Sequence, residues 1–107
     1  MKKIGILNTA IATADGDYTL RTISLPEARE LVAANDIDSA VGHDATASLL
    51  TSLLGVEIPM SRQLFSQERG QEALVFKLNG RPAPGVELDL AGLEEVGFTL
   101  KVLTRID

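Results

Sequence analysis

The only histidine of the chain lies in a context that suits acid–base chemistry on a phosphate. His43 follows Gly42 and precedes Asp44, where a short apolar run ends and a strongly amphipathic helical pattern begins. Because glycine has no side chain, a ligand can approach the backbone at Gly42 closely. The first turn of a helix presents unpaired N–H groups and the positive end of its dipole to an anion. Since histidine titrates near neutral pH and can donate a proton, the pattern predicts a phosphate or phosphodiester site with a proton donor beside it.

Two of these residues also have a purely structural interpretation. A lone histidine in a small domain is as readily a structural or surface residue as a proton donor. Asp44 is a favoured helix N-cap, and we expect it to cap the following helix rather than to act as a catalytic acid.

Further candidates lie at predicted strand ends and in loops. Asn8 and Thr9 follow the first strand, where they either bind a ligand or begin a turn. Arg62 and Arg81 occupy positions at which arginine is often only solvated. Arg81 is the more suggestive, because the prolines and glycines of residues 79–85 fix its backbone beside the strongest predicted strand.

The hydrophobic periodicity predicts one mixed α/β domain over residues 1–107, with a five-stranded sheet and about three helices. We expect the strand at 18–23 to pair with the first strand, and the strands at 62–66 and 73–78 to form a hairpin. A capping box of Ser24 and Glu27 starts the first helix. The predicted strands are 3–7, 18–23, 62–66, 73–78 and 98–103, with a short extended run at 36–41; the predicted helices are 25–34, 44–54 and one capped by Asp89 that ends near Val96.

The composition limits the chemistry that the chain can perform. The absence of cysteine excludes disulfides and thiolate metal sites, and a single histidine argues against a zinc site of the usual kind. We therefore predict no zinc site and no cofactor, while magnesium held by carboxylates stays open on composition alone. Of the 107 residues 45% are hydrophobic but only 4% aromatic, and so small an aliphatic core would gain from further burial in a homodimer.

Charge and hydropathy restrict the partners and the location. A net charge of −5 argues against long nucleic acid as the main partner, because such ligands are bound by broad basic surfaces. A small anion in a local basic pocket of Arg62, Lys77 and Arg81 stays compatible with that charge. The N-terminus lacks the features of a signal peptide, and no segment reaches the roughly 20 apolar residues of a membrane span. We expect a soluble, cytoplasmic protein without membrane contact.

In their order along the chain, several segments resemble one family, the viral and bacterial ring nucleases that degrade cyclic tetra-adenylate. This cyclic oligonucleotide is the second messenger of type III CRISPR immunity, and the viral members of the family act as anti-CRISPR proteins. The resemblance extends over nearly the whole chain. It is most specific in Ser39-Ala40-Val41-Gly42-His43-Asp44-Ala45-Thr46, and it includes Leu7-Asn8-Thr9, 54–62, and 73–78 with Arg81.

The resemblance implies a homodimer that encloses the cyclic ligand at its two-fold axis. It further implies metal-independent cleavage, in which a ribose 2′-hydroxyl attacks the adjacent phosphorus and expels the 5′-oxygen. The linear products end in a 2′,3′-cyclic phosphate. His43 is then the general acid, Arg81 stabilises the charge that develops on the phosphate, and Arg62 is a second ligand-binding arginine. The remaining ligand-contacting positions implied by the resemblance are Asn8, Thr9, Ala10, Ile11, Gly42, Asp44 and Lys77.

Four positions depart from the pattern of the family. Ile11 stands where a viral relative has a loop serine, and Lys77 stands where a glutamine contacts the ligand. Ala45 replaces the serine after the His-Asp pair, and Pro84 replaces an acidic residue. These changes affect individual ligand contacts, ring-size preference and rate, and they leave His43 and both arginines in place.

The chemistry is also feasible when it is considered without the family. The substrate supplies its own nucleophile, and protonation of the leaving oxygen by a well-placed acid contributes roughly 10²–10⁴-fold. Arginines add charge-assisted hydrogen bonds to the phosphate. Because there is no second histidine, the 2′-hydroxyl must lose its proton to water, to a phosphate oxygen or to an unidentified side chain. An isologous dimer would present His43 twice to a symmetric ring.

Three functions remain open at this point. The first is a ring nuclease that switches off or evades CRISPR effector signalling. The second is a sponge or sensor that binds a cyclic oligonucleotide without cutting it. The third is a small scaffold or regulatory protein in which His43 and Asp44 only cap a helix.

Overall fold

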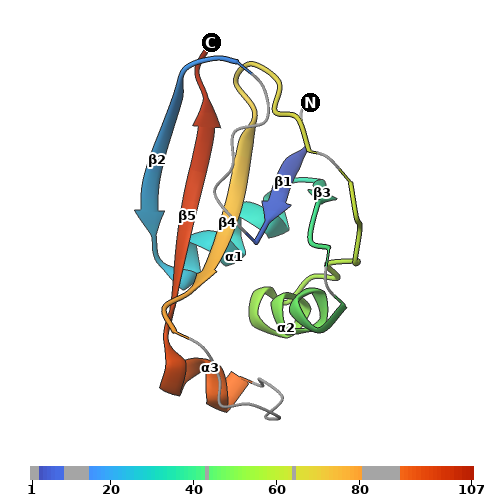
Figure 1. Cartoon of the computed structure of the whole chain (residues 1–107), viewed down its shortest axis with the longest axis vertical. Coiled ribbons are helices and arrows are strands. Elements are labelled where there is room, and N and C mark those ends of the chain that lie inside the picture. The colour runs from blue at the N-terminus through green and yellow to red at the C-terminus, as the bar shows by residue number, and fades with distance from the viewer. Residues whose placement is uncertain (1–2, 9–14, 43, 64, 81–89) are drawn as a thin grey trace.

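A five-stranded mixed sheet organises the chain, with two helices on one face and a third beyond the end of the two longest antiparallel strands (Figure 1). The computed structural model describes residues 3–8, 15–42, 44–63, 65–80 and 90–107. The predicted fold class, a single small α/β domain, is confirmed. In chain order the elements are β1 (Ile4–Leu7), β2 (Tyr18–Ile23), α1 (Leu25–Ala34), β3 (Ile37–Ser39), α2 (Asp44–Leu54), β4 (Glu72–Leu78), α3 (Leu90–Val96) and β5 (Phe98–Arg105).

The short strand β1 is paired in parallel on both sides. It lies between β3 and β4 in the sheet order β2-β5-β4-β1-β3, with Ile6 opposite Ser39 on one side and Leu7 opposite Val75 on the other. The strand β5 then adds antiparallel to β4, and β2 adds antiparallel to β5. The carboxyl ends of β1, β3 and β4 therefore meet at one edge of the sheet, which we call the carboxyl edge.

Two predicted pairings are wrong. The strand at 18–23 pairs with β5 instead of β1, because both sides of β1 are occupied by parallel neighbours. All four residues of β1 are buried, as is typical of a strand inside a parallel sheet. By contrast, β2 exposes most of its residues at the edge of the sheet.

The predicted hairpin of 62–66 with 73–78 is also wrong. The described residues around position 64 form no strand, and the fifth strand is β3, within the run predicted only as extended. The segment before β4 is attached to the sheet by a side chain instead of by strand pairing. The Gln67 amide donates to the backbone oxygens of Gln71 and Leu103, each at 2.8 Å. Gln67 is 3% exposed, so these bonds satisfy a buried amide that no strand ladder could satisfy.

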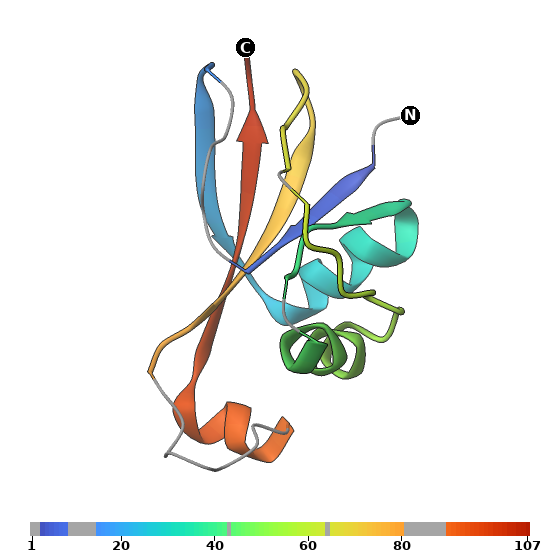
Figure 2. The ribbon, with the colours of Figure 1, turned by 45° about the vertical axis from the view of Figure 1, so that its right-hand side comes forward.

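The helices α1 and α2 lie together on one face of the sheet, and α3 lies beyond the end of β4 and β5 (Figure 2). The helix α1 begins as predicted, since the Ser24 hydroxyl accepts a hydrogen bond from the Glu27 N–H at 3.3 Å. The helix α2 ends at Gly55, whose φ of +78° favours glycine. Apolar side chains of α1, α2 and α3 form the main core with those of β1, β4 and β5, and its most deeply buried members include Ile6, Leu50, Leu74, Leu93, Val41 and Val102.

The opposite face of the sheet is covered in part by Phe65. Its ring lies directly over Gly5, in a smaller cluster with Leu7, Val75 and Leu103. A Cβ placed on Gly5 would lie 2.8 Å from Cε2 of Phe65, so there is no room for a side chain at this position. Glycine inside a strand is typical of such a close approach.

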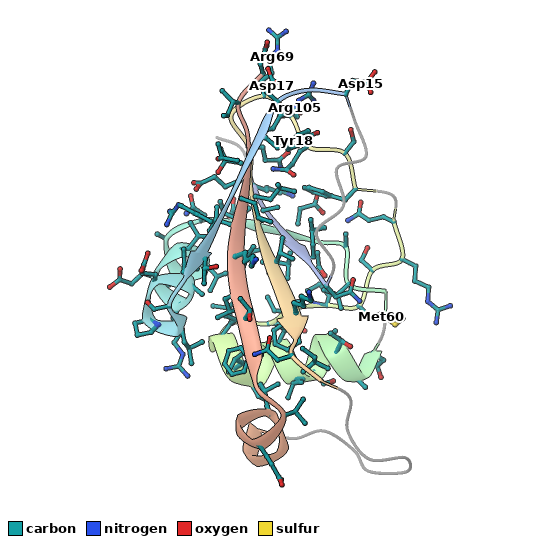
Figure 3. The ribbon with its side chains drawn as sticks, turned by 60° about the vertical axis from the view of Figure 1, so that its left-hand side comes forward. Asp15, Asp17, Tyr18, Met60, Arg69 and Arg105 are labelled. Atoms are coloured by element: carbon teal, nitrogen blue, oxygen red, sulfur yellow. The ribbon has the colours of Figure 1, made fainter. Side chains whose placement is uncertain are left out.

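The other end of the sheet, away from the carboxyl edge, is closed by Arg105 (Figure 3). Its guanidinium donates to the backbone oxygens of Gln67 at 2.5 Å and Asp15 at 2.8 Å. The backbone of residue 105 also bonds the turn before β4, and Asp17 bonds both Ile106 and Asp107. The amino end of β4 and the carboxyl end of β5 are thus fastened together. Among the helices that the structure describes, none combines the length and the apolar character needed to cross a membrane.

The contact of Gly5 with Phe65 gives a stability prediction. Substitution Gly5→Ala should destabilise the domain by about 1–3 kcal/mol, because the new methyl group overlaps the Phe65 ring. Urea denaturation measures this loss. In the double variant Gly5→Ala/Phe65→Leu the methyl group has room, so its loss should be smaller than the sum of the two single losses. Strictly additive losses would contradict the account.

Candidate functional site

The carboxyl edge brings two of the predicted site residues close together. Asn8 directly follows β1 and is half-buried. The Ala40 N–H donates to the Ile6 oxygen at 2.9 Å, so the backbone after β3 continues alongside β1. By this register Gly42 lies one residue beyond the level of Asn8. Ligands of open α/β sheets bind beyond the carboxyl ends of the strands, and this edge is therefore the candidate site.

Gly42 and Arg62 are in direct contact. The Arg62 Nε donates to the Gly42 oxygen at 3.0 Å, although the two residues are 20 positions apart in the chain. The Arg62 side chain is exposed, and within the described ranges its Nη groups have neither a hydrogen-bond acceptor nor a carboxylate partner. The guanidinium is thus oriented by the backbone and keeps donors for an anion.

Lys77 lies on the other side of the same edge. It is exposed near the end of β4, two residues after Val75, the partner of Leu7. Lys77 lies beyond Val75, the last residue of β4 that pairs with β1, and it pairs with Thr99 of β5. A ligand that contacts both Arg62 and Lys77 would therefore have to extend across the end of β1.

Asp44 is exposed and is the first residue of α2. It therefore lies in the first turn of the helix, not at the N-cap that we predicted. A carboxylate there interacts favourably with the helix dipole, and it can accept a hydrogen bond from a ligand hydroxyl.

Five predicted site residues lie outside the described part of the chain: His43, Thr9, Ala10, Ile11 and Arg81. Their roles stay predictions. The same is true of the substituted position Pro84 and of the predicted cap Asp89. Chain continuity nevertheless joins His43 to Gly42 and Asp44, and Arg81 follows Gly80 at the end of the β4 segment. Of the described candidates, Gly42 and Arg62 touch, Asn8 is close to them by register, and Lys77 is separate.

Residues 59–63, in which Arg62 was the one predicted site residue, also shape this edge. Residues 59–63 run beside residues 38–42, and the Ser61 N–H donates to the Val41 oxygen at 2.8 Å. The Ser39 hydroxyl donates to the Pro59 oxygen at 2.7 Å, and the Gln63 amide donates to Asp38 Oδ1 at 2.9 Å. The available signal was a serine between Ile37 and Val41 in a short extended run, because a hydroxyl that becomes buried there needs a partner.

The described residues hold no group of three histidine, aspartate or glutamate side chains arranged to bind a metal ion.

The fold is that of a small α/β domain, and comparison with known proteins assigns the chain to a family. The model of the STIV B116-like family matches residues 4–100, so the chain belongs to that family. It is 33% identical over 107 residues to the uncharacterized protein YddF of Bacillus subtilis (strain 168), covering 98% of this chain and 99% of YddF. It is also 33% identical over 107 residues to the uncharacterized protein ORF117 of Acidianus two-tailed virus, covering 94% of this chain and 92% of ORF117.

A third relative is the uncharacterized protein 26 of Sulfolobus islandicus filamentous virus, 36% identical over 81 residues that cover 75% of this chain and 69% of that protein. Among solved structures, B116 of Sulfolobus turreted icosahedral virus superposes with a TM-score of 0.80 and 16% identity, over 97% of this chain and all of B116. The family therefore has bacterial and viral members, and B116 shares the fold.

The surroundings of Gly42 predict how a side chain there would act. Among the described residues, a Cβ at this position would meet Arg62 Cγ alone, at an ordinary contact distance of 3.5 Å. Gly42→Ala should therefore change the free energy of unfolding by no more than about 0.5 kcal/mol. If a ligand approaches the backbone here, the same variant binds that ligand more weakly. A large loss of stability in urea denaturation would instead show that the fold itself needs glycine.

Proposed function

We propose that the protein is a metal-independent ring nuclease that binds cyclic tetra-adenylate as a homodimer and cleaves it. The observation that carries this proposal is the carboxyl edge, where Arg62 is oriented by Gly42 immediately before His43. In the cell, removal of this messenger would switch off the CRISPR effectors that it activates. Family members from viruses and from a bacterium are consistent with either immune evasion or self-limitation of the response.

The reaction is a transesterification within the substrate. A ribose 2′-oxygen attacks the adjacent phosphorus, and the bond from phosphorus to the 5′-oxygen breaks. The 2′-hydroxyl gives up its proton to water or to a phosphate oxygen, and His43 donates a proton to the departing 5′-oxygen. The product ends are a 2′,3′-cyclic phosphate and a 5′-hydroxyl, and no water is consumed.

The residues of the edge have distinct tasks in this reaction. Arg62 and Arg81 bind the phosphate and stabilise the charge that develops on it. Asn8, with the residues that follow it, and Asp44 bind the sugar and base groups by hydrogen bonds. The ammonium of Lys77, which stands in place of a glutamine of the ring nucleases that the sequence resembles, adds attraction for a second phosphate of the ring. Positioning of the 2′-oxygen in line with the scissile bond supplies much of the rate.

Cleavage is tested by incubating the purified protein with cyclic tetra-adenylate in EDTA and analysing the products by mass spectrometry. Linear oligoadenylates with cyclic phosphate ends are expected. His43→Ala should bind the ring as well as the unchanged protein does and should lose about 10²–10⁴-fold in cleavage rate. If the ring stays intact and the concentration of free ring falls only in proportion to the protein added, the protein is a sponge that binds the ring without cutting it. No binding at all would contradict both functions.

Binding by Arg62 has a matched control on the same protein. Loss of one charge-assisted hydrogen bond costs about 1.5–3 kcal/mol, so Arg62→Ala should weaken ligand binding by roughly 10–100-fold. Arg69 is also an exposed arginine; it lies near Arg105, at the opposite end of the sheet, where it is paired with Asp107 at 3.3 Å. Figure 3 shows Arg69 and Arg105 together, well apart from Met60 in the segment that carries Arg62. Arg69→Ala should bind the ligand normally; equal losses in the two variants would reject the carboxyl edge as the site.

A further inference from the structure

We infer that Ser39 is a positioning residue for the candidate site, and this inference rests on the proposed function. Ser39 ends β3 and is 5% exposed, one of the few buried polar side chains of the described residues. Within the described part of the chain, its hydrogen bonds go to none of the residues that we assign to the ligand. Its hydroxyl instead joins two stretches of backbone that both lead to such residues.

The hydroxyl of Ser39 makes two hydrogen bonds with different partners. It donates to the Pro59 oxygen at 2.7 Å and accepts from the Val41 N–H at 3.3 Å. The first bond ties β3 to the segment of residues 59–63, and the second bends the backbone that continues from β3 to Gly42. The bond from Val41 is buried and the bond to Pro59 is partly buried, so the loss of the hydroxyl leaves the buried Val41 N–H without this acceptor.

Three further bonds extend this connection toward the site. The Gln63 amide donates to the Ser39 oxygen at 2.5 Å, the Ser61 N–H donates to the Val41 oxygen at 2.8 Å, and Arg62 Nε donates to the Gly42 oxygen at 3.0 Å. Residues 39–42 and 59–63 are thus held side by side from Ser39 to the residue before His43. We call these hydrogen bonds the Ser39 brace.

The far end of the same segment is attached to α2. The Thr51 hydroxyl accepts from the Ile58 N–H at 2.8 Å and donates to the Ala47 oxygen at 2.9 Å. The helix α2 begins two residues after Gly42, and the chain leaves its other end before residue 58. The segment of residues 59–63 therefore returns from the end of α2 to its beginning. Ser39 bonds the two stretches of backbone that carry Gly42 and Arg62. A shift of the backbone at Ser39 would therefore misplace both residues.

Misplacement has a larger effect on the rate than on affinity. A transesterification needs the attacking oxygen, phosphorus and leaving oxygen in line, and a shift of about 1 Å in the groups around them can cost roughly 10²-fold. The binding free energy of the ligand is divided among many contacts along the carboxyl edge. A small displacement of Gly42 and Arg62 therefore leaves most of these contacts intact. The Ser39 brace should therefore act on kcat more than on KM.

The test is single-turnover and steady-state cleavage of cyclic tetra-adenylate by Ser39→Ala, with Ser39→Thr as the variant that restores the hydroxyl. Ser39→Ala should lower kcat by about 10²-fold with KM little changed, and Ser39→Thr should recover most of the rate. Amide hydrogen exchange should speed up at Val41 and Ser61 in Ser39→Ala.

A matched control separates positioning from general stability. Gln67 is as buried as Ser39 and also bonds two backbone oxygens, but it lies near Arg105 at the opposite end of the sheet. Gln67→Met removes those bonds with little change in volume and should leave kcat unchanged. If Ser39→Ala does not fold, Gln63→Ala takes its place, because Gln63 is exposed and its loss weakens the same brace.

Each outcome decides the matter. A selective loss of kcat that the threonine variant restores supports the inference. Normal kcat in Ser39→Ala, or an equal loss in Gln67→Met, overturns it while the proposed function stands. An unchanged protein that leaves the ring intact overturns the proposed function, and the positioning role falls with it.

Discussion

The parallel pairing of β1 with a neighbour on each side is the constraint on which the rest of the structure depends. It brings the segments that follow β1, β3 and β4 to one edge of the sheet, although these segments are far apart in the sequence. It requires burial of all four β1 residues, which the helices provide on one face and Phe65 provides on the other. Gly5 is the point at which this requirement is strictest, because the Phe65 ring leaves no room for a side chain.

Polar bonds then shape the edge that hydrophobic packing has assembled. Apolar contacts are non-directional and cannot by themselves set the orientation of Gly42 or Arg62. The Ser39 brace does so with hydrogen bonds of defined length, and Arg105 closes the opposite end of the sheet in a similar way. Order at both ends of the sheet thus comes from side chains bonded to backbone oxygens, with the apolar core between them.

Local signals in the sequence predicted most elements but not their partners. The capping of α1 by Ser24, the length of α2 up to Gly55 and the apolar run of β4 follow from nearby residues, and the structure confirms them. The partner of β2 and the role of residues 59–66 depend on contacts between distant residues, which periodicity does not encode. The same holds for the site: the glycine before His43 was evident, but the contact between Gly42 and Arg62 joins positions 20 residues apart.

The central claim, that the carboxyl edge binds a cyclic oligoadenylate, is tested most directly by mapping the ligand on the protein. Titration of isotope-labelled protein with cyclic tetra-adenylate, followed through backbone amide chemical shifts, distinguishes the two ends of the sheet. The account predicts that the largest changes lie at Asn8, Gly42, Arg62 and Lys77, with Asp17, Gly70 and Arg105 unaffected. Changes centred on Arg105, or none at saturating ligand, would contradict it.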